Sequence, residues 1–510
     1  MMKCYLKNLL IADGTGKNPP FAGEVLLEGA KIAAVGTALH LPPEIPAEDC
    51  GGALLTPGWI DAHGHSDLSL MASPPGWGKI SQGITTEISG NCGLSPFPLT
   101  VHNRAHLQDL YRRYGIGLDW EDFRSYRARL PQDSLKLVPL CGHNTLRAAV
   151  AGYEQKKLSP AQLMEMCRVL ERELSAGAAG LSAGLLYTPG CFSDRQELTE
   201  LLRVTAHCGG IFTTHLRSEG NGLLEALEET LTAVRESGLR RLHISHFKTA
   251  GAENWHKLDA ALRLLEEARQ EGIRVTMDRY PYCESMTQLS VICRGRFEDL
   301  DDSSLETLLR APGAERELAQ LLEDSGRDWR HVRIVSGAFA ERTGCSGRSV
   351  AEIAAAENIS GGALCAALLR EDAVGTMAAF RGMSEENCRR ILQLNDCCCG
   401  TDESVRPENL DFGGSHPRGF GSMPEFFRIL REEGLALEKI VWKMTGLPAS
   451  IFGLHDRGVI APGKAADLVL WEPQKFRSRA SFDAPHRRAE GVCKVWSDGK
   501  VIFSENSVIS

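Results

Sequence analysis

Residues 56–68, TPGWIDAHGHSDL, decide the fold that this sequence predicts. The apolar run at 58–64 is a strand candidate, and His63 and His65 stand at its carboxyl end. Two histidines two positions apart on a strand point to one face, so both imidazoles can grip one metal ion. Two packed or exposed histidines give the same pattern, so the HxH motif indicates a metal site only if further ligand residues stand at the ends of other strands.

Working outward, short runs rich in Val, Ile, Thr and Leu alternate with longer stretches of helical period. Amphipathic segments such as 160–176, 222–237 and 258–271 lie between the apolar runs. The strand candidates are 58–64, 84–91, 135–142, 178–185, 210–216, 242–247 and 274–280, with one more near 396–402. This alternation predicts a parallel sheet with helical crossovers, and eight strands make an α/β (β/α)₈ TIM barrel the economical fold.

Two regions depart from that rhythm. Residues 1–55 and 455–510 are strand-and-turn material, and we expect the two chain ends to pair into one small β domain. Residues 56–454 then form the barrel. Within it, the helix-forming stretch 290–395 lacks the strand–helix alternation and is predicted to be an insertion between the last two barrel strands.

Composition limits the possible partners. The 510 residues carry 57 Lys and Arg against 66 Asp and Glu, a formal charge of −9, and scattered basic residues argue against nucleic-acid or membrane-surface binding. No apolar run approaches the roughly 18 residues of a membrane span, and MMKCYLKNLLIADG turns polar too early for a signal peptide. A cytoplasmic location is expected, and the 16 cysteines are interpreted as reduced thiols.

Further metal-ligand residues stand at the ends of later strand candidates. GITTEISGNCGLSP ends in Cys92 between two glycines, which favours a site thiolate over the usual small core residue. IFTTHLRSEG places His215 at a strand end. In RLHISHFKTAG, His243 and His246 are three apart and therefore on opposite faces. We expect His246 to point into the barrel and His243 to pack against a helix.

The eighth strand candidate ends in CCCGTDES. A lone Asp in such a segment is commonly a turn or helix-capping residue. Beside a metal-activated water, Asp402 would instead be a general base that returns the proton to a leaving amine.

Taken together, HxH on strand one, Cys on two, His on five, His on six and Asp on eight repeat the order of the amidohydrolase superfamily. Over nearly its whole length the sequence resembles the D-aminoacylase (N-acyl-D-amino-acid deacylase) family. The resemblance rests on PGWIDAHGHSD, KISQGITTEISGNCGLSP, CGHNTLR, AGLSAGLLYTPG, THLRSEG, ISHFK, YPY, GTD, HPRGFGSMP and the closing MTGLPASIFGLHDRGVIAPGKAADLVLWEP. The GNCG and HPR segments are the specific ones.

The resemblance implies zinc-dependent hydrolysis of a small-molecule substrate, an N-acyl-D-amino acid, to a carboxylate and a free D-amino acid. It implies one tight Zn²⁺ on Cys92, His215 and His246, a weaker second position on His63 and His65, and Asp402 as the catalytic carboxylate. It also implies that Tyr187, Lys248, Tyr280 and Arg418 bind the substrate.

Two other functions compete with this one. A cyclic amidase of the hydantoinase or dihydroorotase type, or another amide hydrolase of the superfamily, is disfavoured by Cys92 and Arg418. A metal-free structural relative is disfavoured by the complete ligand set and Asp402.

Two departures from the family pattern concern specificity. YPYCESMTQ places bulky Met286 where a substrate-binding serine is expected, so the acyl or side-chain pocket is expected to differ. GTDES adds Glu403 beside Asp402. That second carboxylate either favours a basic or neutral substrate group or faces solvent.

Overall fold

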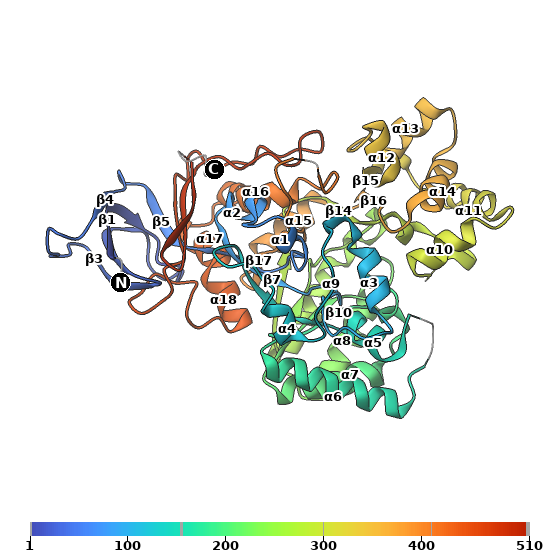
Figure 1. The fold of residues 1–510 in the computed structure, drawn as a ribbon, viewed down its shortest axis with the longest axis horizontal. Helices are drawn as coiled ribbons and strands as arrows, with labels where there is room; N and C mark the ends of the chain where they lie inside the picture. The colour runs from blue at the N-terminus through green and yellow to red at the C-terminus, as the bar shows by residue number, and fades with distance from the viewer. Residues whose placement is uncertain (1–2, 154–156, 299, 410, 506–510) are drawn as a thin grey trace.

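The computed structural model describes residues 3–153, 157–298, 300–409 and 411–505. Both chain ends contribute to one sheet, in the order β20-β19-β18-β5-β1-β2-β3, with β4 beside β1. Its strands are β1 (Lys3–Ile11), β2 (Phe21–Glu28), β3 (Lys31–Gly36), β4 (Ala47–Asp49), β5 (Leu54–Pro57), β18 (Leu468–Trp471), β19 (Val492–Ser497) and β20 (Lys500–Ser504). The antiparallel pairing of β5 with β18 joins the N-terminal and C-terminal parts, which lie side by side in Figure 1.

The central strands are parallel, as the sequence predicts, and form two sheets. One contains β6 (Trp59–Asp61), β7 (Ile84–Ser89) and β8 (Lys136–Pro139) in that order. The other runs β17-β13-β12-β11-β10-β9, from β9 (Cys141–Gly142), β10 (Gly180–Gly184), β11 (Ile211–His215), β12 (Arg241–Ile244), β13 (Arg274–Arg279) and β17 (Cys397–Cys399). A hydrogen bond of 3.0 Å from the Ala62 amide to the Cys399 carbonyl links the sheets beyond β6.

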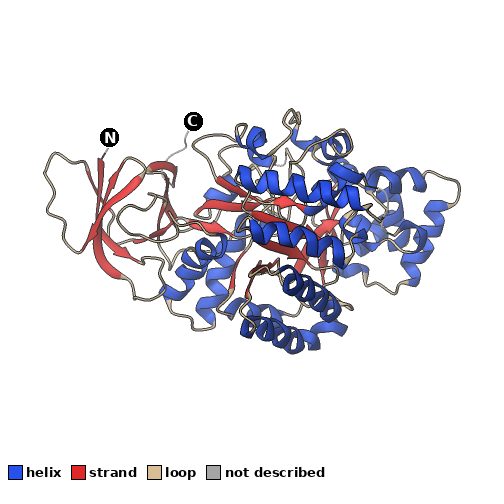
Figure 2. Cartoon of the chain, turned by 90° about the horizontal axis from the view of Figure 1, so that it is seen from below, coloured by secondary structure: helices blue, strands red, loops and turns tan. Residues whose placement is uncertain are grey.

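Helices connect and cover these strands (Figure 2). The crossovers include α5 (His143–Ala151), α6 (Pro160–Ala176), α7 (Arg195–His207), α8 (Leu223–Ser237) and α9 (Leu258–Gln270). Helix α6 shows why the local sequence is helical: Ser159 and Gln162 form a capping box, Pro160 occupies the first turn, and Gly177 ends the helix at φ 118°. The apolar faces of these five crossover helices pack against the parallel strands in one large hydrophobic core. The strands are therefore covered on their outer side and read as continuous apolar runs.

Between β13 and β17 the chain forms a separate body with its own apolar core. An antiparallel sheet of order β14-β16-β15 comprises β14 (Glu284–Gln288), β15 (Val332–Ser336) and β16 (Met377–Arg381). Around it lie α10 (Asp302–Leu309), α11 (Ala314–Asp324), α12 (Ala338–Thr343), α13 (Val350–Glu357) and α14 (Gly361–Asp372). Helix α15 (Glu385–Gln393) then returns the chain to β17, and α16 (Arg418–Glu432), α17 (Leu437–Met444) and α18 (Gly446–Phe452) follow.

In the described part of the chain, no single helix is long and apolar enough to cross a membrane. The bent pair α13 and α14 meets that criterion by length and composition only.

Candidate metal and catalytic site

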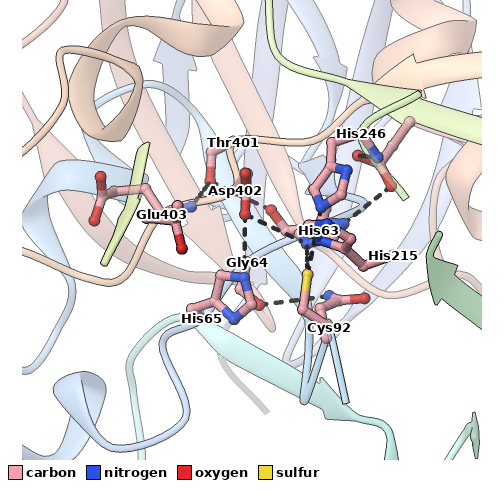
Figure 3. A network of polar contacts seen from close by, with 12 residues as sticks. His63, Gly64, His65, Cys92, His215, His246, Thr401, Asp402 and Glu403 are labelled. Carbon is pink, nitrogen blue, oxygen red and sulfur yellow. Dashed lines mark hydrogen bonds and ion pairs between the residues drawn. The ribbon is translucent and has the colours of Figure 1, made fainter. Parts of the chain in front are cut away.

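Four of the side chains singled out from the sequence converge where the parallel strands end. Ligand atoms of His63, Cys92, His246 and Asp402 all lie within 4.8 Å of one another (Figure 3). The Cys92 Sγ atom is 3.4 Å from Nε2 of His63 and 3.4 Å from Nε2 of His246. These four residues follow four different strands, β6, β7, β12 and β17, and lie up to 339 positions apart in the sequence.

The backbone at this site is unusual. Cys92, His246 and Asp402 have φ angles of 53°, 35° and 52°, in a region that side chains other than glycine rarely adopt. At Cys92 the neighbouring glycines make the turn possible, since a Cβ on Gly93 would lie 2.0 Å from Oδ1 of Asn144. Such conformations persist only where the surrounding structure holds them, and they gather at functional sites.

The electrostatics prepare Cys92 as a ligand. Burial would raise the pKa of its thiol, but His63 and His246 outweigh that effect and lower the pKa well below its ordinary value. The thiolate is the metal-binding form of cysteine. His215 is also buried, and neither of its ring nitrogens makes a hydrogen bond within the described residues. A buried thiolate beside an unsatisfied imidazole and a second imidazole fits Zn²⁺, which prefers sulfur and nitrogen ligands.

The two histidines of the HxH motif contact different residues. Strand β6 ends at Asp61, so both histidines lie in the following turn rather than on one face of a strand. His63 reaches Cys92 with Nε2, while its Nδ1 lies 3.1 Å from Oδ2 of Asp278. His65 Nε2 instead contacts Oδ1 of Asp402 at 3.1 Å, and its side chain stays 25% exposed. His65 therefore lies at the edge of the cluster and supports Asp402.

Around His246 the structure adds a carboxylate that sequence reasoning missed. Glu219 Oε1 lies 2.9 Å from Nδ1 of His246, and its Oε2 lies 3.6 Å from Nε2 of His215. Lys248 donates to Glu219 and lies 2.8 Å from Nδ1 of His246. The signal was present in HLRSEG, where an acidic residue follows His215 by four positions. Lys248, expected to bind substrate, is thus held by two site residues in this arrangement.

Asp402 is enclosed by charged and aromatic groups. Arg418 Nη1 donates to its Oδ2 at 2.7 Å, and the Arg418 guanidinium lies over the Tyr280 ring at 4.8 Å. Burial would raise the pKa of Asp402, but Arg418 and the hydrogen bond with His65 hold it well below its usual range. For Tyr280, burial raises the pKa above its ordinary value, so the phenol keeps its proton at neutral pH. The pair combines an ionised carboxylate with a neutral hydrogen-bond donor.

The remaining predicted binding residue, Tyr187, lies beside His215 with ring centroids 4.9 Å apart. Its hydroxyl is 3.2 Å from Oγ1 of Thr287. The neighbouring Met286 side chain packs against Val335 and Ala379, so its bulk lies within the β14-β16-β15 body. Successive side chains alternate along a strand, and this alternation brings Thr287 rather than Met286 to Tyr187.

Glu403 does not face solvent. It is 2% exposed, and its Oε1 lies 3.4 Å from Nε of Arg406. The solvent-facing interpretation of this second carboxylate is therefore wrong, because the chain after Asp402 turns inward and Arg406 compensates the buried charge.

His243 has a contact that the sequence did not indicate. Its ring does lie against Phe452 of α18, at 5.2 Å. Its Nε2, however, is 2.9 Å from Oδ2 of Asp278, the same oxygen that approaches His63. Burial would raise the pKa of Asp278, but His63 and His243 lower it below its ordinary value. His243 therefore packs against a helix as expected, and in addition Asp278 links it to His63.

Comparison with known proteins gives three consistent results. The chain matches the amidohydrolase family over residues 47–503. It is 33% identical to the N-acyl-D-glutamate deacylase and 32% identical to the D-aminoacylase of Alcaligenes xylosoxydans xylosoxydans, covering 97% and 98% of this chain and 92% and 95% of those proteins. The crystal structure of the N-acyl-D-glutamate deacylase from Bordetella bronchiseptica, complexed with zinc and a phosphonate mimic of the tetrahedral intermediate, matches with a TM-score of 0.81 and 31% identity. That match covers 99% of this chain and 97% of the other.

Proposed function

This chain belongs to the amidohydrolase family and to its D-aminoacylase branch, and on that premise we propose that it hydrolyses the amide bond of N-acyl-D-amino acids. The products are a carboxylate and a free D-amino acid. The observation that carries the proposal is the convergence of Cys92, His63, His246 and Asp402 within 4.8 Å at the strand ends. A thiolate, imidazoles and an ionised carboxylate in one cluster have the composition of a hydrolytic metal site.

We propose that the two parallel sheets together form a (β/α)₈ barrel that presents this cluster. We also propose that the predicted segments 1–55 and 455–510, of which 1–2 and 506–510 lie outside the described residues, contribute a small β domain through residues 3–55 and 455–505. The Ala62–Cys399 hydrogen bond and the β5–β18 pairing support both parts of this assignment.

For the metal, we propose Zn²⁺ held tightly by Cys92, His215 and His246, with a weaker second position at His63 and His65. The low thiol pKa of Cys92 and the unsatisfied ring of His215 support the tight position. When bound, zinc supplies Lewis acidity toward the amide carbonyl and lowers the pKa of water.

Side chains of the protein would transfer the proton and stabilise the charge that develops on the substrate. Asp402 is ionised, so it accepts a proton from the attacking water and passes it to the nitrogen of the leaving amine. Tyr280 is neutral and donates a hydrogen bond to the oxyanion that develops on the carbonyl. We propose that Arg418 binds the substrate carboxylate, and that Tyr187 and Lys248 also contact the substrate.

A substrate panel tests the proposal. N-acetyl-D-amino acids with acidic, apolar and basic side chains are compared with their L-enantiomers and with hydantoins, with zinc added and zinc removed. Release of amine from the D-acyl compounds alone, dependent on zinc, supports the proposal. Hydrolysis of the cyclic substrates alone would assign the chain to the cyclic amidases, and activity that survives complete metal removal would refute the metal role.

A further inference from the structure

A buried charge cluster below the site has no part in the chemistry above. Lys79, in helix α2 (Trp77–Ile80), is 0% exposed. Its Nζ atom lies 2.7 Å from Oδ2 of Asp61 and 2.9 Å from Oε2 of Glu87. Placing three charged groups out of water is costly, and a buried ion pair seldom repays that cost in stability alone. The cluster therefore calls for an explanation beyond packing.

The ammonium group of Lys79 also reaches the turn that carries Asp402. It donates to Oγ1 of Thr401 and, at 2.8 Å, to the carbonyl oxygen of Glu403. These two residues flank Asp402 directly, as Figure 3 shows. Asp61 completes the arrangement, because the Thr401 amide donates to its Oδ1 at 2.8 Å. Lys79 thus contacts the Thr401 hydroxyl on one side of the proposed catalytic carboxylate and the Glu403 carbonyl on the other.

This turn needs such support. Asp402 has a φ angle of 52°, which costs a residue with a side chain free energy unless its surroundings impose it. The Asp402 amide donates to the carbonyl of His63 at 2.7 Å, and the His65 amide donates to the carbonyl of Glu403 at 3.1 Å. The turn with Asp402 and the turn with the HxH pair are therefore joined, and a shift of one moves the other.

Glu87 connects the turn with the HxH pair to the same charge cluster. Its Oε1 accepts from the Ser66 amide at 2.9 Å, and its Oε2 accepts from the Ser66 hydroxyl at 2.7 Å. The Val405 amide in turn donates to the Ser66 hydroxyl at 3.0 Å. A Cβ on Gly64 would come within 2.1 Å of the Glu87 carboxyl carbon, so this carboxylate lies directly against the HxH turn.

We propose that Lys79 is a positioning residue for the hydrolytic reaction, which holds Asp402 in its strained conformation against the HxH turn through Thr401 and the Glu403 carbonyl. The inference rests on the proposed function for its kinetic consequence, but its structural consequence can be measured without substrate. Lys79 lies beneath the turn and touches neither substrate nor reacting atoms. Its loss should lower turnover and leave substrate binding nearly unchanged.

Removing Lys79 alone leaves Asp61 and Glu87 as unpaired buried carboxylates and risks unfolding. The test therefore compares Lys79→Met/Glu87→Gln with Glu87→Gln, because the glutamine removes one of the two carboxylates and keeps hydrogen-bonding groups for Ser66. The two variants differ only at Lys79. Lys443→Met is the matched control, since Lys443 is likewise buried, at 2% exposure, but donates to the carbonyl of Leu394. Thr401→Val gives a second route, as it removes the hydroxyl that Lys79 reaches.

Two measurements decide the outcome. In Lys79→Met/Glu87→Gln, kcat should fall at least about tenfold relative to Glu87→Gln, with KM changed by less than about threefold and full zinc content. Hydrogen exchange of the 401–405 amides should accelerate in the same comparison, while Lys443→Met leaves both quantities unchanged. Thr401→Val should lower kcat in the same direction.

A folded, zinc-loaded double variant with unchanged amide exchange and kcat within about twofold of Glu87→Gln would overturn the inference. A loss confined to KM, or an equal loss in Lys443→Met, would overturn it too. If the double variant fails to fold, normal kcat and normal exchange in Thr401→Val count against it. Absence of deacylase activity in the wild type refutes the proposed function instead, and amide exchange then decides the role of Lys79.

Discussion

Arg418 offers the most informative perturbation, because it is the proposed receptor for the substrate carboxylate and also contacts Asp402, the proposed catalytic carboxylate. It is 2% exposed, donates from Nη1 to Asp402 at 2.7 Å, and approaches the Met286 carbonyl with Nη2 at 3.4 Å. Its guanidinium also lies over Tyr280. In Arg418→Lys the positive charge remains, but the planar fork and the stacked contact are lost.

The expected magnitude follows from these contacts. A hydrogen bond to a charged group contributes about 1.5 to 3 kcal/mol. If the fork also binds the substrate carboxylate, that contact is lost in the variant, and kcat/KM for an N-acetyl-D-amino acid falls about 10-fold to 150-fold. Weakening of the contact with Asp402 lowers turnover of every substrate, so this part of the loss is common to all of them.

The assay separates the two contributions by using matched substrates. An N-acetyl-D-amino acid is compared with the corresponding N-acetyl-D-amino-acid amide, which lacks the carboxylate. The ratio of the two kcat/KM values cancels the effect that passes through Asp402. We expect the acid to lose at least about tenfold more than the amide in Arg418→Lys.

Equal losses on both substrates would refute the assignment of Arg418 as carboxylate receptor. Arg418 would then act only through its contacts within the protein, chiefly the 2.7 Å hydrogen bond to Asp402, and carboxylate recognition would have to come from another residue. Lys248→Met, assayed on the same pair, provides the comparison, because Lys248 is also a buried cation and contacts the site through Glu219 and His246.

Three further predictions follow from the site and from the body between β13 and β17. Cys92→Ala should lose the tight zinc, because one of three proposed ligands is removed, and elemental analysis showing a full equivalent of metal would contradict the ligand set. Asp402→Asn should keep its zinc while kcat falls about 100-fold or more, and near-normal turnover of the zinc-loaded variant would exclude its role in proton transfer. Burial raises the pKa of Asp302 to about 7, so the folded state holds this proton more tightly than the unfolded state and stability falls as pH rises from about 4 to about 7. Asp302→Asn should therefore raise the thermal unfolding midpoint at about pH 8 more than at about pH 5, and an equal shift at both pH values would show that the carboxyl group of Asp302 is not the cause.

Much of the architecture could be predicted because strands and helices each produce a local pattern of apolar residues. A buried parallel strand needs a continuous apolar run and a crossover helix needs a 3.6-residue period, so each strand candidate overlaps an observed strand, from β6 at Trp59–Asp61 to β17 at Cys397–Cys399. Strand ends can be located in the same way. His63, Cys92 and His246 were therefore found from the sequence, since each follows such a run directly.

The resemblance to the D-aminoacylase family also comes from the sequence alone, because GNCG and HPR are contiguous segments that can be recognised without coordinates. The comparisons confirm that resemblance. Strand alternation alone did not give the side-chain direction at Met286, because direction depends on which face of β14 meets the barrel.

Tertiary structure alone decided the supporting contacts. Asp278 lies 215 positions from His63, and Lys79 lies 322 positions from Thr401, so no local period relates either pair. Their meeting depends on how parallel strands pair and on where the chain turns after each strand. His65 was expected on the same strand face as His63, but β6 ends at Asp61. The His65 side chain instead contacts Asp402, which is distant in the sequence. The sequence by itself indicated His63, Cys92, His246 and Asp402, because each follows a strand pattern that can be recognised locally. Only the packing of distant segments brought Glu219, Asp278 and Lys79 to them, because no local pattern relates residues so far apart in the chain.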